Sequence, residues 1–92
     1  MPDPPFKETL AAAKRGEETA WQRLFRALAP ALLGFLRARG AGEPEDVMSE
    51  TFLQMSRDIH RFKGDERGLR AWAFSIAHHR LIDASRSKAR RP

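Results

Sequence analysis

The side chains best suited to catalysis or metal binding are a few histidines and one nearby aspartate. His79 and Asp83 are four residues apart, so on a helix they would lie on one face and could share a metal ion. Two ligands do not make a metal site without further partners, and His60 and His78 are more typical of a polar helix surface. No glycine-rich phosphate loop joins a strand to a helix. We therefore predict a non-enzymatic protein with no catalytic residues, no metal and no cofactor.

Positive charge is concentrated in the last third of the chain. Residues 1–56 contain seven Lys and Arg against eight Asp and Glu, whereas residues 57–92 contain ten against four. The formal net charge of +5 therefore comes from the second segment. Basic groups placed near phosphates release condensed counterions, so this distribution is typical of a segment that binds nucleic acid. For a charge run taken alone, a solvated helix face with a frayed basic tail is the more common explanation, and a basic tail could also bind an anionic membrane surface.

Aromatic and histidine side chains are interleaved with these basic residues. The interleaved set is Lys63, Arg67, Arg70, Trp72, Phe74, His78, His79 and Arg80. Aromatic rings beside a basic groove hold unpaired bases by stacking, at about 1–3 kcal/mol per base. Ser75 and His79 would share one helical surface and could face such a partner together. Trp72 continues an apolar stripe and is expected in the core, whereas Phe74 lies off that stripe and fits either role.

A scaffold of helices is expected to carry these side chains, because the apolar residues recur at helical spacing and no stretch alternates with a period of two. We predict an all-α fold, a compact bundle of three main helices plus a short N-terminal helix. The expected segments of this single domain are an N-terminal arm with a short helix (1–16), helices at 17–39 and 44–61, a loop at 62–68, a helix at 69–88 and a basic tail at 89–92.

The apolar stripes indicate which side of each helix faces the core. They comprise Trp21, Leu24, Phe25, Leu28, Leu32, Phe35 and Leu36, then Met48, Phe52, Met55, Ile59 and Phe62, then Leu69, Trp72, Ala73, Ile76, Ala77 and Leu81. Pro30 lies inside the first stripe, where its ring clashes with the preceding turn, so we expect a kink there. Pro44 suits the first turn of the next helix.

Length and composition restrict the class of protein further. Ninety-two residues allow one small domain, and the absence of cysteine excludes disulfides and thiolate metal sites. No apolar run approaches the ~20 residues that cross a bilayer. The first residues lack the basic-then-apolar order of a signal peptide. We expect a cytoplasmic protein without membrane insertion.

Several short motifs occur in one order and spacing. They are Glu45-Asp46-Val47, Glu50-Thr51-Phe52-Leu53, Phe62-Lys63-Gly64-Asp65, Arg70-Ala71-Trp72, Ile76-Ala77 and Leu81-Ile82-Asp83. No single motif is specific, but the ordered set, over about Glu17 to Arg91, closely resembles region 2 of the extracytoplasmic-function (ECF) group of bacterial sigma factors of the sigma-70 family.

The resemblance implies two binding surfaces. The helix opened by Glu45 and Asp46 would dock on the clamp helices of the β′ subunit of core RNA polymerase, where its acidic start suits an arginine-bearing partner. The polymerase-binding residues implied by position are Asp46, Ser49, Glu50, Leu53, Gln54 and Arg57. The resemblance also implies an anti-sigma factor as a partner.

The second implied surface would recognise and melt the −10 promoter element and capture a flipped base of its non-template strand in the 62–68 loop. Extruding a base costs a few kcal/mol, which pocket and phosphate contacts must offset. Ser75 and His79 would read bases, while arginines would hold phosphates. The full DNA-binding set is Phe62, Lys63, Gly64, Asp65, Arg67, Arg70, Phe74, Ser75, His78, His79, Arg80, Arg86, Arg90 and Arg91.

The chain departs from the family pattern at several positions. His79 replaces a frequent Asn and Ser75 a frequent Arg, so the preferred −10 sequence does not carry over from relatives. Ser56 replaces a frequent Trp near the end of its helix, and Ser49 replaces the usual Gln. Family members continue into a helix-turn-helix region 4 that reads the −35 element. The resemblance implies that this chain, without region 4, is a fragment or a single-domain form.

Two other functions fit parts of the pattern. A helical protein-interaction adaptor could use the basic surface to bind acidic proteins or membranes, and it would not distinguish single-stranded from duplex DNA. A small metal-assisted enzyme could use His78, His79 and Asp83, and the metal content of the purified protein would test it.

Overall fold

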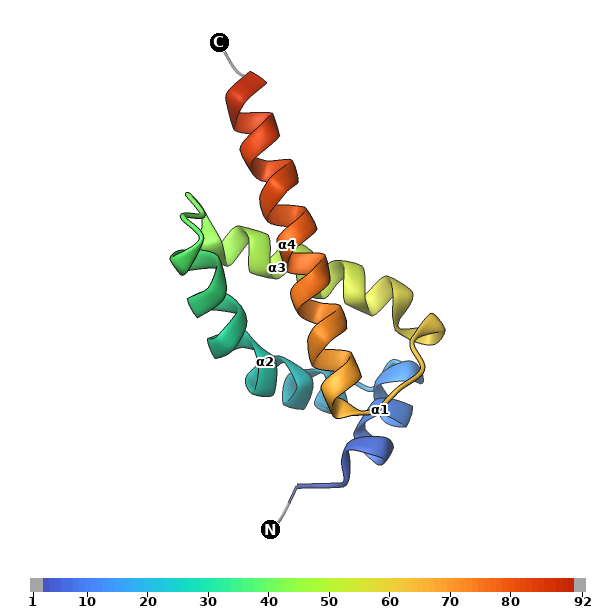
Figure 1. Ribbon diagram of the computed structural model, residues 1–92. Helices are drawn as coiled ribbons and strands as arrows, with labels where there is room; N and C mark the ends of the chain where they lie inside the picture. Colours follow the sequence, from blue (N-terminus) through green and yellow to red (C-terminus); the bar gives the residue numbers. More distant parts are fainter. Residues whose placement is uncertain (1–2, 91–92) are drawn as a thin grey trace.

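The computed structural model describes residues 3–90, which form four α-helices and one short 3-10 turn (Figure 1). These are α1 (Phe6–Lys14), α2 (Glu18–Ala38), α3 (Pro44–Asp58), η1 (Ile59–Arg61) and α4 (Glu66–Arg90). No strand occurs within this range. The prediction of an all-α fold with three long helices and a short N-terminal helix is confirmed.

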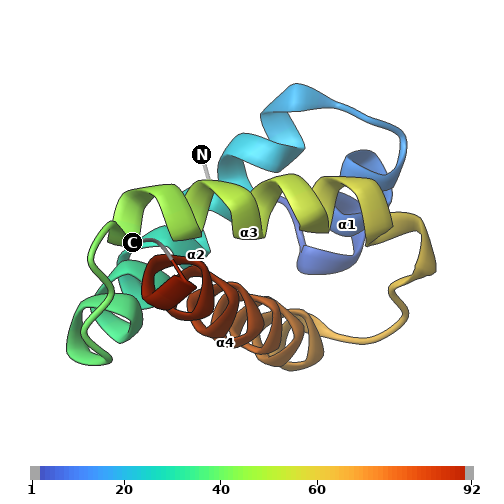
Figure 2. The same cartoon turned by 90° about the horizontal axis from the view of Figure 1, so that it is seen from above.

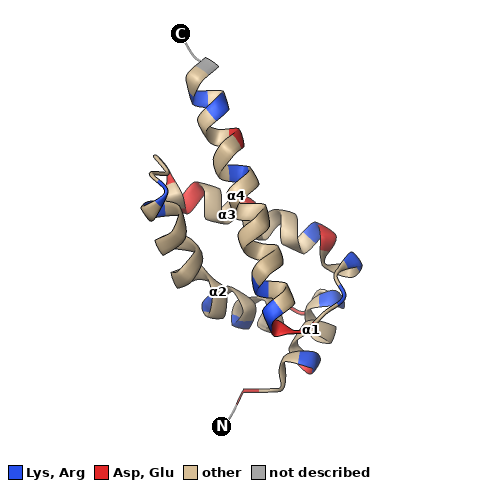
Figure 3. Cartoon of the chain, in the orientation of Figure 1, with Lys and Arg blue, Asp and Glu red and all other residues tan. Residues whose placement is uncertain are grey.

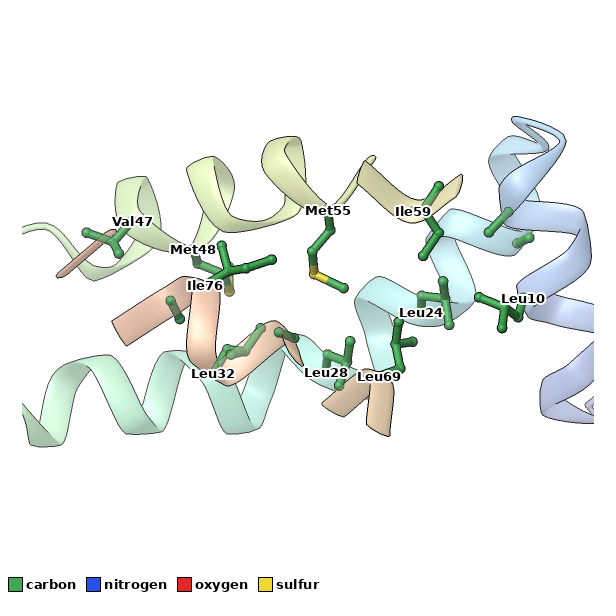
Figure 4. Close-up of a cluster of buried hydrophobic side chains, with 14 of the residues drawn as sticks. Leu10, Leu24, Leu28, Leu32, Val47, Met48, Met55, Ile59, Leu69 and Ile76 are labelled. Atoms are coloured by element: carbon green, nitrogen blue, oxygen red, sulfur yellow. The ribbon is translucent and has the colours of Figure 1, made fainter. Parts of the chain in front are cut away.

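The core lies where α2, α3 and α4 meet, and α1 closes it at one end (Figure 4). Figure 2 shows α4 lying alongside α3, and these two helices share the most extensive contact of the fold. The largest fully buried side chains are Leu32, Leu36, Met55, Leu69 and Thr51. Each buried aliphatic side chain stabilises the fold by about 1.5–3 kcal/mol relative to an exposed one. The buried Thr51 hydroxyl donates to the Val47 carbonyl oxygen at 2.8 Å, which satisfies the polar group within the core.

Most of the residues predicted for the core are buried or half-buried, and Phe25 is the exception. Its side chain is 41% exposed, and its ring lies 4.8 Å from the half-buried ring of Phe52. The prediction that Phe25 faces the core is therefore wrong. The apolar stripe of α2 is wider than the strip that the neighbouring helices cover, so its edge reaches the surface.

Local backbone chemistry accounts for the turn between α2 and α3. Helix α2 continues through Pro30 and ends before Gly40. Gly40 has φ of 80°, and its N–H donates to Arg37 O at 3.0 Å while that of Ala41 donates to Leu36 O at 3.0 Å. A residue in the left-handed backbone conformation, together with these two hydrogen bonds, commonly ends a helix, and glycine adopts this conformation most easily. Pro44 occupies the first turn of α3, as predicted.

Helix α4 is longer than predicted at both ends. It begins at Glu66 because the Asp65 carboxylate accepts a 2.9 Å hydrogen bond from the Gly68 N–H, an N-cap that outweighs the low helix propensity of glycine. It continues to Arg90, so residues 89 and 90 extend the helix and are not a separate tail. The preceding helix also ends earlier than predicted, since Ile59–Arg61 form the 3-10 turn.

The C-terminal half of α4 extends beyond the rest of the bundle (Figure 1). Residues 83–89 are all exposed, and the described residues span 50 × 24 × 20 Å because of this projection. Figure 3 shows basic residues both on this projection and at the opposite end of the same helix. None of the helices in residues 3–90 is long and apolar enough to cross a membrane.

Candidate nucleic-acid and polymerase interfaces

The loop between η1 and α4 is built around the ring of Phe62. This ring stacks on Trp72 with centroids 5.4 Å apart and planes at 22°. Gly64 has φ of 153°, and a Cβ atom added there would lie 3.1 Å from the Phe62 ring. A Cβ atom on Gly68 would lie 3.6 Å from the same ring. Phe62, predicted to bind DNA, thus shapes the loop from inside, and one of its faces is already covered by Trp72.

The polar side chains of the loop and of the first turn of α4 comprise exposed cations, the exposed Glu66 and the capping carboxylate of Asp65. Lys63 and Arg67 are exposed, and Arg70 is exposed one turn further along α4. Asp65 was expected to bind DNA, but its carboxylate accepts the hydrogen bond that starts α4. Lys63 and Arg67 therefore project from a segment whose backbone the Asp65 cap and the Phe62 ring hold in place.

Lys14 contacts this loop, and the sequence patterns did not predict that contact. Its Nζ donates to the carbonyl oxygen of Phe62 at 2.6 Å, across 48 residues of chain. Lys14 lies in the last turn of α1, which packs against η1. A lysine at the end of a helix is ordinary, so no local pattern could have identified this contact.

Phe74, which the sequence left undecided, packs between helices. Its ring meets Phe35 of α2 edge-on, with centroids 5.3 Å apart and planes at 75°. The Arg70 guanidinium lies 5.7 Å from the Phe74 ring centroid, and that of Arg39 lies 5.0 Å from the Phe35 centroid. Such exposed cation–π contacts contribute about 0.5–1 kcal/mol each. Phe74 thus joins α2 to α4 and orients Arg70.

The surface of α4 that was expected to read bases is open to solvent. Ser75, His78 and His79 are all exposed, and the two imidazole rings lie 6.1 Å apart. His79 Nδ1 lies 2.7 Å from the carbonyl oxygen of Ser75, and because a carbonyl only accepts, Nδ1 is the donor. In the neutral imidazole this leaves Nε2 as a hydrogen-bond acceptor.

The remaining arginines of α4 have different surroundings. Arg80 is half-buried and donates from Nε to Gln54 Oε1 of α3 at 3.0 Å. The structure thus joins two residues that were expected to bind different partners. Arg86 is exposed on the projecting part of α4. The side chain of Arg90 and the whole of Arg91 lie outside the described residues.

The expected polymerase-binding residues form one exposed stripe on α3. Asp46, Ser49, Glu50, Leu53 and Arg57 are exposed, with Leu53 52% exposed, whereas Gln54 is half-buried against Arg80. Asp46 and Glu50 also line a cleft beside the C-terminal half of α4.

An apolar groove of about 720 Å³ runs along the other side of this stripe, between α2 and α3. Its lining includes Trp21, Phe25, Phe52 and Leu53. The sequence placed these aromatic residues in the core, so it did not predict an apolar surface here. Within residues 3–90 no three His, Asp or Glu side chains lie close enough to hold a metal ion, so the metal-assisted alternative gains no geometric support.

Comparison with known proteins identifies a family and a relative. Residues 24–91 match the family described as Sigma-70 region 2. The chain is also 32% identical over 78 residues to the ECF RNA polymerase sigma factor RpoE of Cereibacter sphaeroides. This aligned stretch covers 83% of this chain and 42% of that protein. The chain thus spans less than half the length of this relative. No solved structure matches the chain significantly.

Proposed function

Because the chain belongs to the Sigma-70 region 2 family, we propose that it acts in transcription initiation by binding core RNA polymerase and capturing the −10 promoter element as a single strand. The observation that carries this proposal is the 62–65 loop together with the first turn of α4. It places the exposed cations Lys63 and Arg67 on a backbone shaped by the Phe62 ring and the Asp65 cap. The role is one of binding, without a catalytic step.

Capture of a single strand requires the loop to compensate for lost base stacking. Extruding a base costs a few kcal/mol, and every phosphate that Lys63, Arg67 or Arg70 neutralises releases a counterion in return. A loop already ordered before binding loses less conformational entropy when DNA arrives. The Asp65 cap and the stacked rings of Phe62 and Trp72 order the loop before DNA binds. This order supports the N-terminal end of α4 as the site for a flipped non-template base.

Base selection is assigned to the exposed surface of α4 beside the loop. In the neutral imidazole, His79 Nε2 would accept a hydrogen bond from an exocyclic amino group of a base, because Nδ1 is engaged with Ser75 O. The Ser75 hydroxyl can donate or accept, so it discriminates less. Phosphate contacts along Arg86 would add affinity without sequence preference.

Docking on the β′ clamp helices is assigned to the exposed stripe of α3. Leu53 offers an apolar side chain that is 52% exposed, and the exposed residues Asp46 and Glu50 precede it on the same stripe. Interfaces of this kind take most of their affinity from a few central anchors, while rim charges set register and association rate. An anti-sigma factor that competes for this stripe would block docking, and both interactions would take place in the cytoplasm.

A binding assay with matched nucleic acids tests the DNA part of the proposal. The chain should bind a fluorescent single-stranded non-template oligonucleotide weakly and with strong salt dependence, and should bind the matching duplex less well. Core polymerase should increase the affinity for a promoter bubble. Equal binding to single strand and duplex, with no effect of polymerase, would favour the adaptor alternative.

A further inference from the structure

The loop that faces the proposed DNA site has few attachments of its own. The Phe62 N–H donates to Ile59 O at 3.0 Å, and the Asp65 carbonyl accepts from Leu69 N at 3.0 Å. Between these points, within residues 3–90, no backbone hydrogen bond is made by Lys63 or Gly64. The ammonium of Lys14 reaches into this stretch and donates to the Phe62 carbonyl at 2.6 Å.

Helix α1 is itself held firmly, so Lys14 can act as an anchor. Leu10 and Ala13 are buried, and the indole N–H of Trp21 donates to the Ala13 carbonyl at 3.1 Å. The carbonyl that fixes α1 to α2 therefore belongs to the residue directly before Lys14. This helix lies outside residues 24–91, the part that matches the Sigma-70 region 2 family.

We propose that Lys14 is a positioning residue for the 62–65 loop. Its ammonium holds the carbonyl of Phe62 while Trp72 holds the Phe62 ring. These two contacts fix the direction of the backbone after Phe62, so that Lys63 is exposed to solvent. Lys14 acts through this backbone and not through a phosphate contact. The inference rests on the proposed function, because it assumes that the loop receives single-stranded DNA.

Three variants separate positioning from charge. Lys14→Met removes the donor and keeps the aliphatic stem, whereas Lys14→Arg keeps a charged donor. Lys7→Met removes the same charge from the same helix, and Lys7 is exposed and makes none of the side-chain hydrogen bonds found within residues 3–90. Lys14 is also exposed, so the variants should fold as the native chain does.

The first measurement needs no DNA. The carbonyl ¹³C shift of Phe62 in the 92-residue chain should change in Lys14→Met, return in Lys14→Arg and stay unchanged in Lys7→Met. An unchanged signal in Lys14→Met, or an equal change in Lys7→Met, would overturn the proposal. This readout follows the hydrogen bond itself, so it remains decisive if the chain does not bind DNA.

The second measurement is affinity for a fluorescein-labelled single-stranded oligonucleotide at several salt concentrations. Lys14→Met should lose about three- to tenfold, as for one hydrogen bond, and Lys14→Arg should recover most of it. The salt dependence of DNA binding should be the same in Lys14→Met as in Lys7→Met. Equal affinity losses in the two Met variants would overturn the proposal, as would a salt slope lower by about one in Lys14→Met alone, because both indicate a charge effect. If the native chain fails to bind, the proposed function is contradicted, and the Phe62 signal alone decides whether Lys14 holds the loop.

Discussion

The guanidinium of Arg80 on α4 donates from Nε to Oε1 of Gln54 on α3, at 3.0 Å and partly buried. The resemblance had assigned Arg80 to DNA and Gln54 to polymerase. In the structure the two side chains are hydrogen-bonded to each other, so Arg80 Nε and Gln54 Oε1 are already engaged within the fold. This pair therefore stabilises the crossing of the two helices that carry the proposed surfaces.

Loss of the Arg80–Gln54 hydrogen bond should lower the stability of the domain. Arg80→Met should reduce the free energy of unfolding by about 0.5–1.5 kcal/mol, and so should Gln54→Met. The double variant should lose less than the sum of the two, because both substitutions remove one interaction. Urea unfolding of the four proteins measures this coupling. Arg86→Met, at an exposed position, is the control and should change stability little. Additive losses would contradict a direct interaction.

Gly64→Ala should disturb the loop at the start of α4. The residue has φ of 153°, and the new Cβ would lie 3.1 Å from the Phe62 ring. We expect the free energy of unfolding to fall by about 1–2 kcal/mol, with weaker binding of single-stranded DNA. Gly34→Ala is a matched control, because this glycine lies within α2 with open space around its Cβ position. That change should stabilise the domain by about 0.5–1 kcal/mol. Urea unfolding should thus give opposite signs, and equal signs would contradict the described loop.

His79→Ala should change which −10 sequence the domain prefers. Loss of a base contact costs about 1–3 kcal/mol for the base that was read and little for the others. Arg86→Ala should instead weaken all sequences alike and lower the salt dependence by about one. Competition between single-stranded oligonucleotides that differ at single positions measures both effects. Uniform losses for both variants would exclude His79 from base reading.

Leu53→Ala should weaken binding to a β′ clamp fragment by about tenfold or more, if Leu53 is a central anchor. Its affinity for single-stranded DNA and its stability should stay near the native values, because the side chain is 52% exposed and lies on α3. Glu50→Ala should have a smaller effect that diminishes at high salt. Titration calorimetry with the clamp fragment measures both, and Glu8→Ala on α1 is the control. Unchanged clamp binding in Leu53→Ala would show that the stripe on α3 does not dock there.

The helices and their order could be predicted from local patterns. The spacing of Leu24, Leu28 and Leu32 places them on one face of α2, and all three are buried. The motif order that pointed to sigma region 2 agrees with the family match over residues 24–91. Helix α4 starts at Glu66 and not at the predicted residue 69, because the Asp65 carboxylate caps the Gly68 N–H.

The exposure of the candidate site residues could be predicted from the sequence only in part. Lys63, Arg67, Ser75 and His79 are exposed, as a binding surface requires. Other members of the predicted set proved to have internal contacts, such as Phe62 with Trp72. Residue type indicates what a side chain can bind, but not whether a neighbour in the fold already binds it.

The sequence by itself determined the class of fold, the segregation of charge and the resemblance to a family, because these depend on spacing along one chain. Only the tertiary structure decided that Phe25 reaches the surface, that Arg80 bonds Gln54 and that Lys14 holds the Phe62 carbonyl. The reason is physical. Helical periodicity is set within a few residues, whereas the partner of a long side chain depends on how distant helices cross.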